Sequence, residues 1–356
     1  MIQVFKSINI DWLGRRRLFI GISVALMLAG LGSAMFRQWK HPNGTDAFNL
    51  GVDFKGGTVV TTKFNQPTTA EAIREILGRQ GVTDATIQGV TDRPNTFLIK
   101  VPLEGAAGEQ SQAEVEQGRK RIRDALNTIG PEKEAYEILG TDAVGAVAGA
   151  QLRNKAIAVT LAALVGMLVF IAFRFEWTYG AAAVIAVFHD VLVTLGFFSI
   201  FQWEISLTVI AALLTLVGAS VNDTIVVFDR IRENRRLHRR ETLYKITNDS
   251  INQTLSRTVI TQGLIILSVL AMVIFGGDVL RGFSLALLIG TIVGTYSSIA
   301  VASPIMVWWE QRIEAANKAA ALGAAPVNTR ATRAGSSKVK AEALSARAEK
   351  QPRGAV

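Results

Sequence analysis

The sequence predicts an α-helical membrane protein with six transmembrane helices and one α+β domain outside the membrane. Three observations lead to this fold class. Hydrophobic residues make up 49% of the 356-residue chain, and the mean hydropathy is +0.30. They gather in six blocks, each near the length of roughly 20 residues that a helix needs to cross a bilayer. Between the first two blocks lies a long stretch with charges of both signs, as expected of a solvated domain.

The six blocks predict the spans in order. They lie at residues 18–36, 156–173, 181–201, 205–228, 258–275 and 283–309. The last block is longer than one crossing needs, so the pattern leaves its ends open. The first block has no clear small-x-small cleavage site followed by a separate mature domain. It is therefore expected to be a signal anchor and not a cleaved signal peptide.

The placement of the basic residues predicts the orientation. The net charge is +9, and cations cluster at residues 15–17, 230–245 and 312–340. With six spans these segments share one side, which the positive-inside rule assigns to the cytoplasm. Residues 1–17 are then a cytoplasmic N-terminus. Residues 310–356 are a basic cytoplasmic tail, expected to be disordered because it lacks apolar periodicity.

Orientation accounts for the basic residues, so nucleic acid is not an expected partner. The chain has no cysteine, which excludes disulfides and thiolate metal sites. Its three histidines, His41, His189 and His238, are scattered, and no metal site is expected.

The stretch at residues 38–154 predicts a ferredoxin-like domain. Strands are expected at residues 58–64, 85–90, 97–101 and 136–139, and helices at residues 69–78 and 110–128. Their order, β-α-β-β-α-β, is that of a split-βαβ unit. Asp53, Lys55 and the neighbouring glycines do not match a phosphate-binding loop, and His41 is the only histidine of the domain. We therefore expect no enzymatic site here, and a binding or moving role instead.

A charge inside the fourth block is the strongest functional signal. Asp223 follows Asn222 within the block, and a carboxylate in a membrane helix costs about 2.5–3.5 kcal/mol on insertion scales. The alternative is a residue near the helix end that reaches for the headgroups, although a short aspartate does this poorly. We interpret Asp223 as a functional residue.

Three further residues extend this interpretation. His189 and Asp190 lie in the middle of the third block, either as a second functional pair or as a structural clasp. Arg257 precedes the fifth block, with Gln262 as a polar neighbour, and is either a positive-inside anchor or the counter-charge of Asp223. A contact between Asp223 and Arg257 that forms and breaks would load and release a proton.

Four motifs give the chain a resemblance to a known family. They are GVDFKGGT at residues 51–58, FHD at 188–190, VNDTIVVFDRIREN at 221–234 and SRT at 256–258. On these motifs residues 8–310 resemble the SecF side of the SecD/SecF family, within the resistance-nodulation-division superfamily. The first motif contributes Gly51, Asp53, Phe54, Gly56 and Gly57.

The resemblance implies a six-helix half-transporter with a periplasmic first domain. Such a subunit pairs with SecD and uses the proton motive force to pull preproteins through the SecYEG translocon after SecA. It implies a multi-pass protein of the bacterial inner membrane, coupled to protons and needing no other cofactor. Further expected partners are YajC, YidC and membrane lipid. The family's proton relay maps onto Asp223 and Arg257, with another aspartate from SecD.

The chain departs from the family at one place. The family shows Val-Gly-Pro-x-Val-Gly before the second helix, where this chain reads LGTDAVG at residues 139–145, without the proline. The rigidity of that hinge is therefore not predicted. Two alternative functions stay open: half of a proton-driven small-molecule exporter, and a non-transporting scaffold subunit.

Overall fold

The computed structural model describes residues 9–40, 47–83, 85–90, 93–102, 111–144, 146–174 and 177–323. In these ranges six helical stretches are long and apolar enough to cross a membrane. They are α1 (Arg16–Lys40), α5 (Ala146–Arg174), α6 (Trp177–Phe201), α7 (Leu207–Leu237), α8 (Leu243–Phe275) and a run that starts with α9 (Gly277–Ser297). That run continues through a π-helical segment, η1 (Ser298–Ala302), into α10 (Ser303–Gly323). The six-helix prediction is confirmed.

Several helices extend past their apolar blocks. α7 continues beyond Phe228 to Leu237, where Arg230 and Glu233 pair at 2.7 Å one turn apart. α8 begins at Leu243, well before residue 258, because the Thr242 hydroxyl accepts a hydrogen bond from the Lys245 N–H and caps the helix. Hydropathy marks only the apolar part of a helix, since charged residues with good helix propensity prolong it in water.

The predicted tail at residues 310–356 is helical in its first part. α10 runs to Gly323, so residues 310–323 form a helix, and the disorder predicted for this part is wrong. Alanine and the long polar residues of this part favour a helix even without an apolar stripe. The rest of the predicted tail lies outside the described residues.

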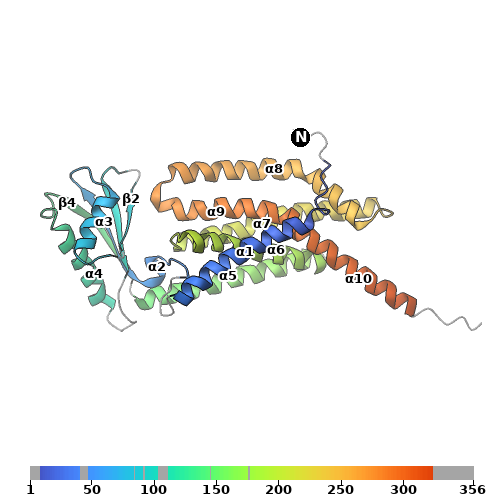
Figure 1. Ribbon diagram of the computed structural model, residues 1–356, viewed down its shortest axis with the longest axis horizontal. Helices are drawn as coiled ribbons and strands as arrows, with labels where there is room; N and C mark the ends of the chain where they lie inside the picture. The colour runs from blue at the N-terminus through green and yellow to red at the C-terminus, as the bar shows by residue number, and fades with distance from the viewer. Residues whose placement is uncertain are drawn as a thin grey trace, which may run out of the picture. The chain divides into compact units, whose positions relative to one another are not determined.

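The domain between α1 and α5 holds a four-stranded antiparallel sheet (Figure 1). Its elements are β1 (Gly57–Phe64), α3 (Ala70–Arg79), β2 (Thr86–Gly89), β3 (Thr96–Pro102), α4 (Ser111–Leu126) and β4 (Tyr136–Val144). The strand order β2-β3-β1-β4, with every neighbouring pair antiparallel, is compatible with the predicted ferredoxin-like unit. One apolar core joins sheet and helices, with Ile73, Ile99 and Ile122 fully buried.

The last strand is longer than predicted. β4 continues past residue 139 to Val144 and pairs with β1 from Phe64↔Tyr136 to Gly57↔Val144. The stretch where the family has its proline is therefore part of an edge strand. A residue with a backbone N–H can donate to the sheet here, which proline cannot do. Pairing with β1 is what orders this stretch in the absence of proline.

The glycine motif forms a short helix that the sequence pattern did not predict. α2 (Val52–Lys55) ends at Gly56, whose φ of 81° favours glycine. A Cβ on Gly149 of α5 would lie 2.8 Å from the Gly56 nitrogen, so the two backbones meet at two glycines. Gly57 then opens β1. The motif lets the chain turn tightly between α1 and the sheet.

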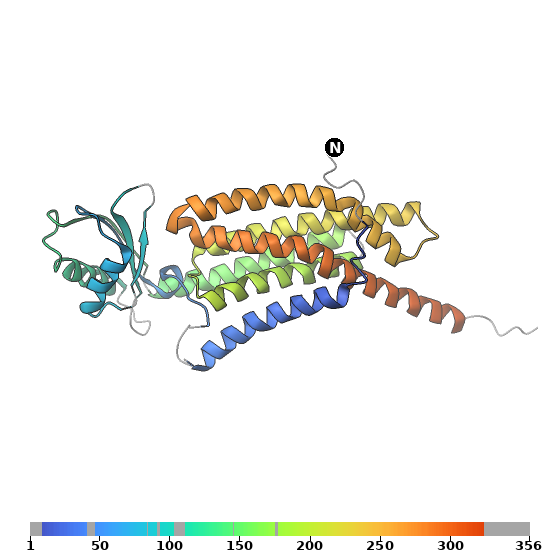
Figure 2. The same ribbon diagram turned by 45° about the horizontal axis from the view of Figure 1, so that its top comes forward.

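The membrane-length helices lie side by side in both views (Figure 1, Figure 2). α6, α7 and α9 contribute most of the buried positions, whereas α1, α5 and α8 keep apolar faces exposed. Exposed apolar faces on long helices suit lipid or a second membrane subunit.

The described part of the N-terminal segment is held against α8. Asn248 Oδ1 accepts from the Trp12 N–H at 2.8 Å, and Asn252 Nδ2 donates to the Ile10 carbonyl at 3.0 Å. Hydrogen bonds from the Tyr244 hydroxyl and the Gly14 N–H hold the pKa of the Asp11 carboxyl below its usual value. Two asparagines one turn apart thus bind the backbone of this segment.

Replacing Ile99 with alanine should loosen the soluble domain. Ile99 is fully buried in β3, and removing such a side chain costs about 2–5 kcal/mol. Hydrogen–deuterium exchange of the full chain in detergent should show faster exchange in β1 and β3. The exposed Leu139→Ala in β4 is the control, and equal exchange in both variants would contradict the assigned core.

Candidate functional site

Asp223 is buried in α7 and hydrogen-bonded to a neutral residue. Its side chain is 4% exposed, and its Oδ2 accepts a hydrogen bond of 2.6 Å from Gln262 Nε2 of α8. The Gln262 Oε1 atom is buried and has no hydrogen-bond partner among the residues that the structure describes. A buried carboxylate that meets only an amide is not electrically compensated by that contact.

Arg257 lies on a different face of α8. It is exposed, and within the described chain no ion pair joins it to Asp223. Arg257 and Gln262 are five residues apart, so at 3.6 residues per turn they cannot share one face. Gln262 is therefore the residue of α8 that hydrogen-bonds the carboxylate. The pairing of Asp223 with Arg257 stays a prediction.

Asn222 is exposed although it precedes a buried residue. Consecutive residues of a helix point about 100° apart, so Asn222 and Asp223 face different surroundings. The Asn222 side chain forms no hydrogen bond with the described residues. Asn222 and Asp223 are adjacent in the sequence, but their side chains thus have different surroundings.

A second buried carboxylate connects three helices. Asp190 of α6 is fully buried, and its Oδ2 accepts from the Ser220 hydroxyl of α7 at 2.5 Å and the Ser297 hydroxyl of α9 at 2.8 Å. Its Oδ1 lies 3.0 Å from His189 Nδ1. Burying this carboxylate requires all three contacts, because an unsatisfied charge in an apolar bundle is costly.

The surroundings of this cluster are unusual. Ser297 is the last residue of α9, directly before the π-helical turn η1, and such turns are frequent at functional sites. Gly294 lets α9 approach α7 closely, since a Cβ on Gly294 would lie 3.2 Å from Ser220 Cβ. His189 Nε2 is buried without a partner among the described residues. His189 and Asp190 contact each other, as a structural clasp would require. A functional role for the pair stays a prediction.

α7 connects the two buried carboxylates, because it contains Asp223 and its Ser220 bonds Asp190. Ser220 bonds Asp190 through its side chain and accepts from Thr224 Oγ1 through its carbonyl at 3.1 Å. Asp223 is the residue before Thr224. Ser220, one turn before Thr224 on the helix, is a site residue that the sequence analysis did not identify. It could not be placed because its partner lies on another helix.

The other end of α7 is joined to the glycine motif. Asp53 Oδ2 accepts a 3.0 Å hydrogen bond from the Leu207 N–H, at the first residue of α7. The Ser206 side chain does not cap this end, so the carboxylate of Asp53 takes that role across a long sequence separation. Backbone bonds add to the joint: Gly51 N–H donates to Ile205 O at 2.8 Å, and Ile205 N–H donates to Asn49 O at 2.7 Å.

The close approach at this joint explains two residues of the motif. A Cβ on Gly51 would lie 2.7 Å from Glu204 Oε1 and 3.2 Å from the Ile205 carbonyl, so a side chain here would push both groups away. Phe54 is buried in a cluster with Phe198 and Val209 at the same end of the bundle. The motif therefore anchors the domain to α6 and α7.

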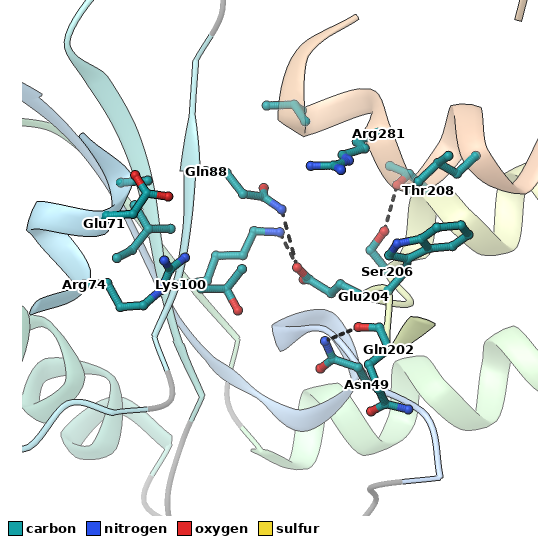
Figure 3. Close-up of a pocket in the computed structure, with 17 residues that line it drawn as sticks. Asn49, Glu71, Arg74, Gln88, Lys100, Gln202, Glu204, Ser206, Thr208 and Arg281 are labelled. Carbon is teal, nitrogen blue, oxygen red and sulfur yellow. Dashed lines mark hydrogen bonds and ion pairs between the residues drawn. The ribbon is translucent and has the colours of Figure 1, made fainter. Parts of the chain in front are cut away.

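Glu204, in the loop between α6 and α7, makes a further link to the sheet (Figure 3). It pairs with Lys100 of β3 at 3.0 Å and accepts from Gln88 of β2 at 3.5 Å. The charged groups of this pair are largely buried, which favours a stable contact over a solvated one. Sequence reasoning missed this pair because its partners are far apart in the chain.

Comparison with known proteins identifies the family. The family model described as "Protein export membrane protein SecD/SecF, C-terminal" matches residues 123–312, and the model of the SecD/SecF GG motif matches residues 44–68. The chain belongs to the SecD/SecF family. The GG motif contains the joint described above, and the C-terminal model contains both buried carboxylates.

Individual relatives agree with the family model. The protein translocase subunit SecF of Koribacter versatilis is 39% identical, with 91% of this chain and 97% of that protein covered. The SecF of Escherichia coli O157:H7 is 41% identical over 74% of this chain and 79% of that protein. The SecDF chain in the crystal structure from Thermus thermophilus is 36% identical in sequence to this chain, and the two folds superpose with a TM-score of 0.69. The match covers 86% of this chain and 39% of the SecDF chain. Family and helices make this chain a multi-pass protein of the bacterial inner membrane.

Replacing Asp190 with asparagine should destabilise the bundle. Both hydroxyls donate to the same oxygen, Oδ2. An amide must either turn its NH2 group toward them or offer a neutral oxygen that accepts more weakly than a carboxylate, at a cost of about 1–3 kcal/mol. A thermal unfolding midpoint below that of the wild-type chain in the same detergent is expected. Asn222→Ala, at an exposed position, serves as the control, and an unchanged midpoint for Asp190→Asn would contradict the clasp.

Proposed function

We propose that this chain is the SecF-type subunit of a SecDF complex, which uses the proton motive force to assist Sec-dependent preprotein translocation. The carrying observation is Asp223, a 4% exposed carboxylate in a membrane helix that contacts a neutral glutamine. Binding a proton lowers the free energy of burying such a carboxylate, because protonation removes the charge. The relatives named protein translocase subunit SecF support the substrate class.

Proton movement supplies energy of a useful size. One elementary charge that crosses 100 mV releases about 2.3 kcal/mol. A few protons per cycle thus match the several kcal/mol needed to shift a two-state equilibrium strongly. In this proposal Asp223 carries the proton, Arg257 approaches it in another state of the cycle, and SecD contributes a further aspartate. Asp190 and His189 act as a secondary pair.

α7 is the element through which the proton site reaches the soluble domain. The helix starts at the Leu207 N–H held by Asp53, and it carries Asp223 roughly 24 Å further on at 1.5 Å per residue. A helix of this length moves as a rod. A shift of α7 upon protonation would therefore move the Asp53 joint and the sheet attached through Glu204.

The proposal includes an orientation and a set of partners. Both termini lie in the cytoplasm and the soluble domain in the periplasm, in accord with the positive-inside rule. SecD, SecYEG, SecA and the preprotein are the proposed partners, with YajC and YidC as additional subunits. The chain needs no cofactor besides the protons and catalyses no covalent reaction. This chain matches 39% of the SecDF chain, and in the proposal SecD is a separate chain that corresponds to the remainder.

The alternatives have less support. An exporter half is not favoured, because the relatives are named translocase subunits. A scaffold subunit would share the family and the fold. It differs in that it would not need the charge at Asp223.

Asp223→Asn should abolish the proton-driven part of preprotein export. Asparagine still accepts from Gln262 but cannot carry a proton. We expect translocation in inverted vesicles, at equal assembly with SecD, to fall to the level seen without a proton motive force. Asn222→Ala, next to it on the exposed face, should keep full activity. Full activity of Asp223→Asn would favour the scaffold.

Asp53→Ala should uncouple the domain from α7. Alanine removes the cap of the Leu207 N–H, a loss of about 0.5–2 kcal/mol, whereas asparagine at the same position still accepts this hydrogen bond. We expect Asp53→Ala to lose most of the proton-dependent export and Asp53→Asn to keep most of it. Equal losses in both variants would show that the charge, and not the cap, matters.

A further inference from the structure

The end of α7 farthest from the Asp53 joint carries a cleft lined by arginines. Arg232, Arg235, Arg236 and Arg239 form it together with Tyr179 of α6, and its volume is about 250 Å³. Residues 232, 235 and 236 stand at i, i+3 and i+4 and therefore share one face of the helix. Arg239 follows directly after the end of α7 at Leu237. Four guanidinium groups are thus gathered around one small space.

Two acidic side chains near this cluster pair with cations outside it. Glu233 pairs with Arg230 at 2.7 Å, and Glu241 pairs with Lys245 at 2.7 Å. Within the described chain, no ion pair or side-chain hydrogen bond involves the guanidinium groups of Arg232, Arg236 and Arg239. Like charges at this spacing repel one another, so a bound anion would stabilise the cluster.

The depth of the cleft matches the headgroup layer of a membrane. Trp177, at the start of α6 and 64% exposed, stands two residues from Tyr179, and such aromatic residues concentrate at the membrane interface. Figure 2 shows α7 and α8 continuing past the start of α6 at this end of the bundle. The arginines line the cleft together with Tyr179, two residues from Trp177.

We propose that this cleft binds the phosphate headgroup of an anionic phospholipid. Guanidinium groups bind phosphate oxygens through two parallel hydrogen bonds, and basic pockets beside transmembrane helices bind anionic headgroups. The positive-inside rule and the helix dipole both explain cations at this end. Neither explains why the arginines of α7 and a tyrosine of α6 line one cleft.

Native mass spectrometry of the full chain in detergent tests the proposal, independently of translocation. The chain is titrated with phosphatidylglycerol or, as the zwitterionic control, phosphatidylcholine. The wild-type chain should retain phosphatidylglycerol at least about tenfold more strongly than phosphatidylcholine, and R232Q/R236Q should lose this preference. R232K/R236K, which keeps the charge but not the paired hydrogen bonds, should show an intermediate affinity.

The matched control removes two arginines elsewhere. R16Q/R17Q lowers the charge equally at the start of α1 and should keep the preference. Equal retention by R232Q/R236Q and the wild-type chain would overturn the proposal. So would displacement of the lipid by millimolar inorganic phosphate, which would make free phosphate the ligand, or displacement by a short RNA, which would make the cleft a nucleic-acid site.

Discussion

The central constraint on this protein is that two carboxylates must be kept inside an apolar helical bundle. Asp190 is accommodated by two hydroxyl groups and an imidazole from its surroundings. Asp223 is accommodated by one amide. Asp190 thus links three helices through several donors, whereas Asp223 has a single neutral donor.

α7 gathers the consequences of this constraint. It provides Ser220 to the first carboxylate and Asp223 itself, and at its start it is capped by Asp53 of the glycine motif. The residues of the glycine motif therefore have structural roles, which are given by their contacts. Gly51 permits close approach to the loop before α7, Phe54 fills the end of the bundle, and Gly56 allows the turn into β1. The basic end of the same helix faces the cleft proposed for lipid.

Much of the architecture was predictable because hydropathy and charge act locally. Six apolar blocks and the β-α-β-β-α-β order follow from periodicity, and the structure contains both. The ends were less predictable. α7 and α8 extend beyond their apolar parts, β4 continues where a proline was expected, and the tail begins as a helix. In each case propensity, capping or strand pairing added residues that hydropathy does not detect.

The sequence by itself determined the class of the protein, its membrane spans, the soluble domain and the identity of the buried charges, because each depends on residues close together in the chain. Only the tertiary structure decided the partners of those charges. These contacts join distant elements: Gln262 with Asp223, Ser220 and Ser297 with Asp190, and Asp53 with Leu207. Helix rotation and packing set such contacts. A rotation of 100° per residue separates Asn222 from Asp223 even though they are adjacent in the chain.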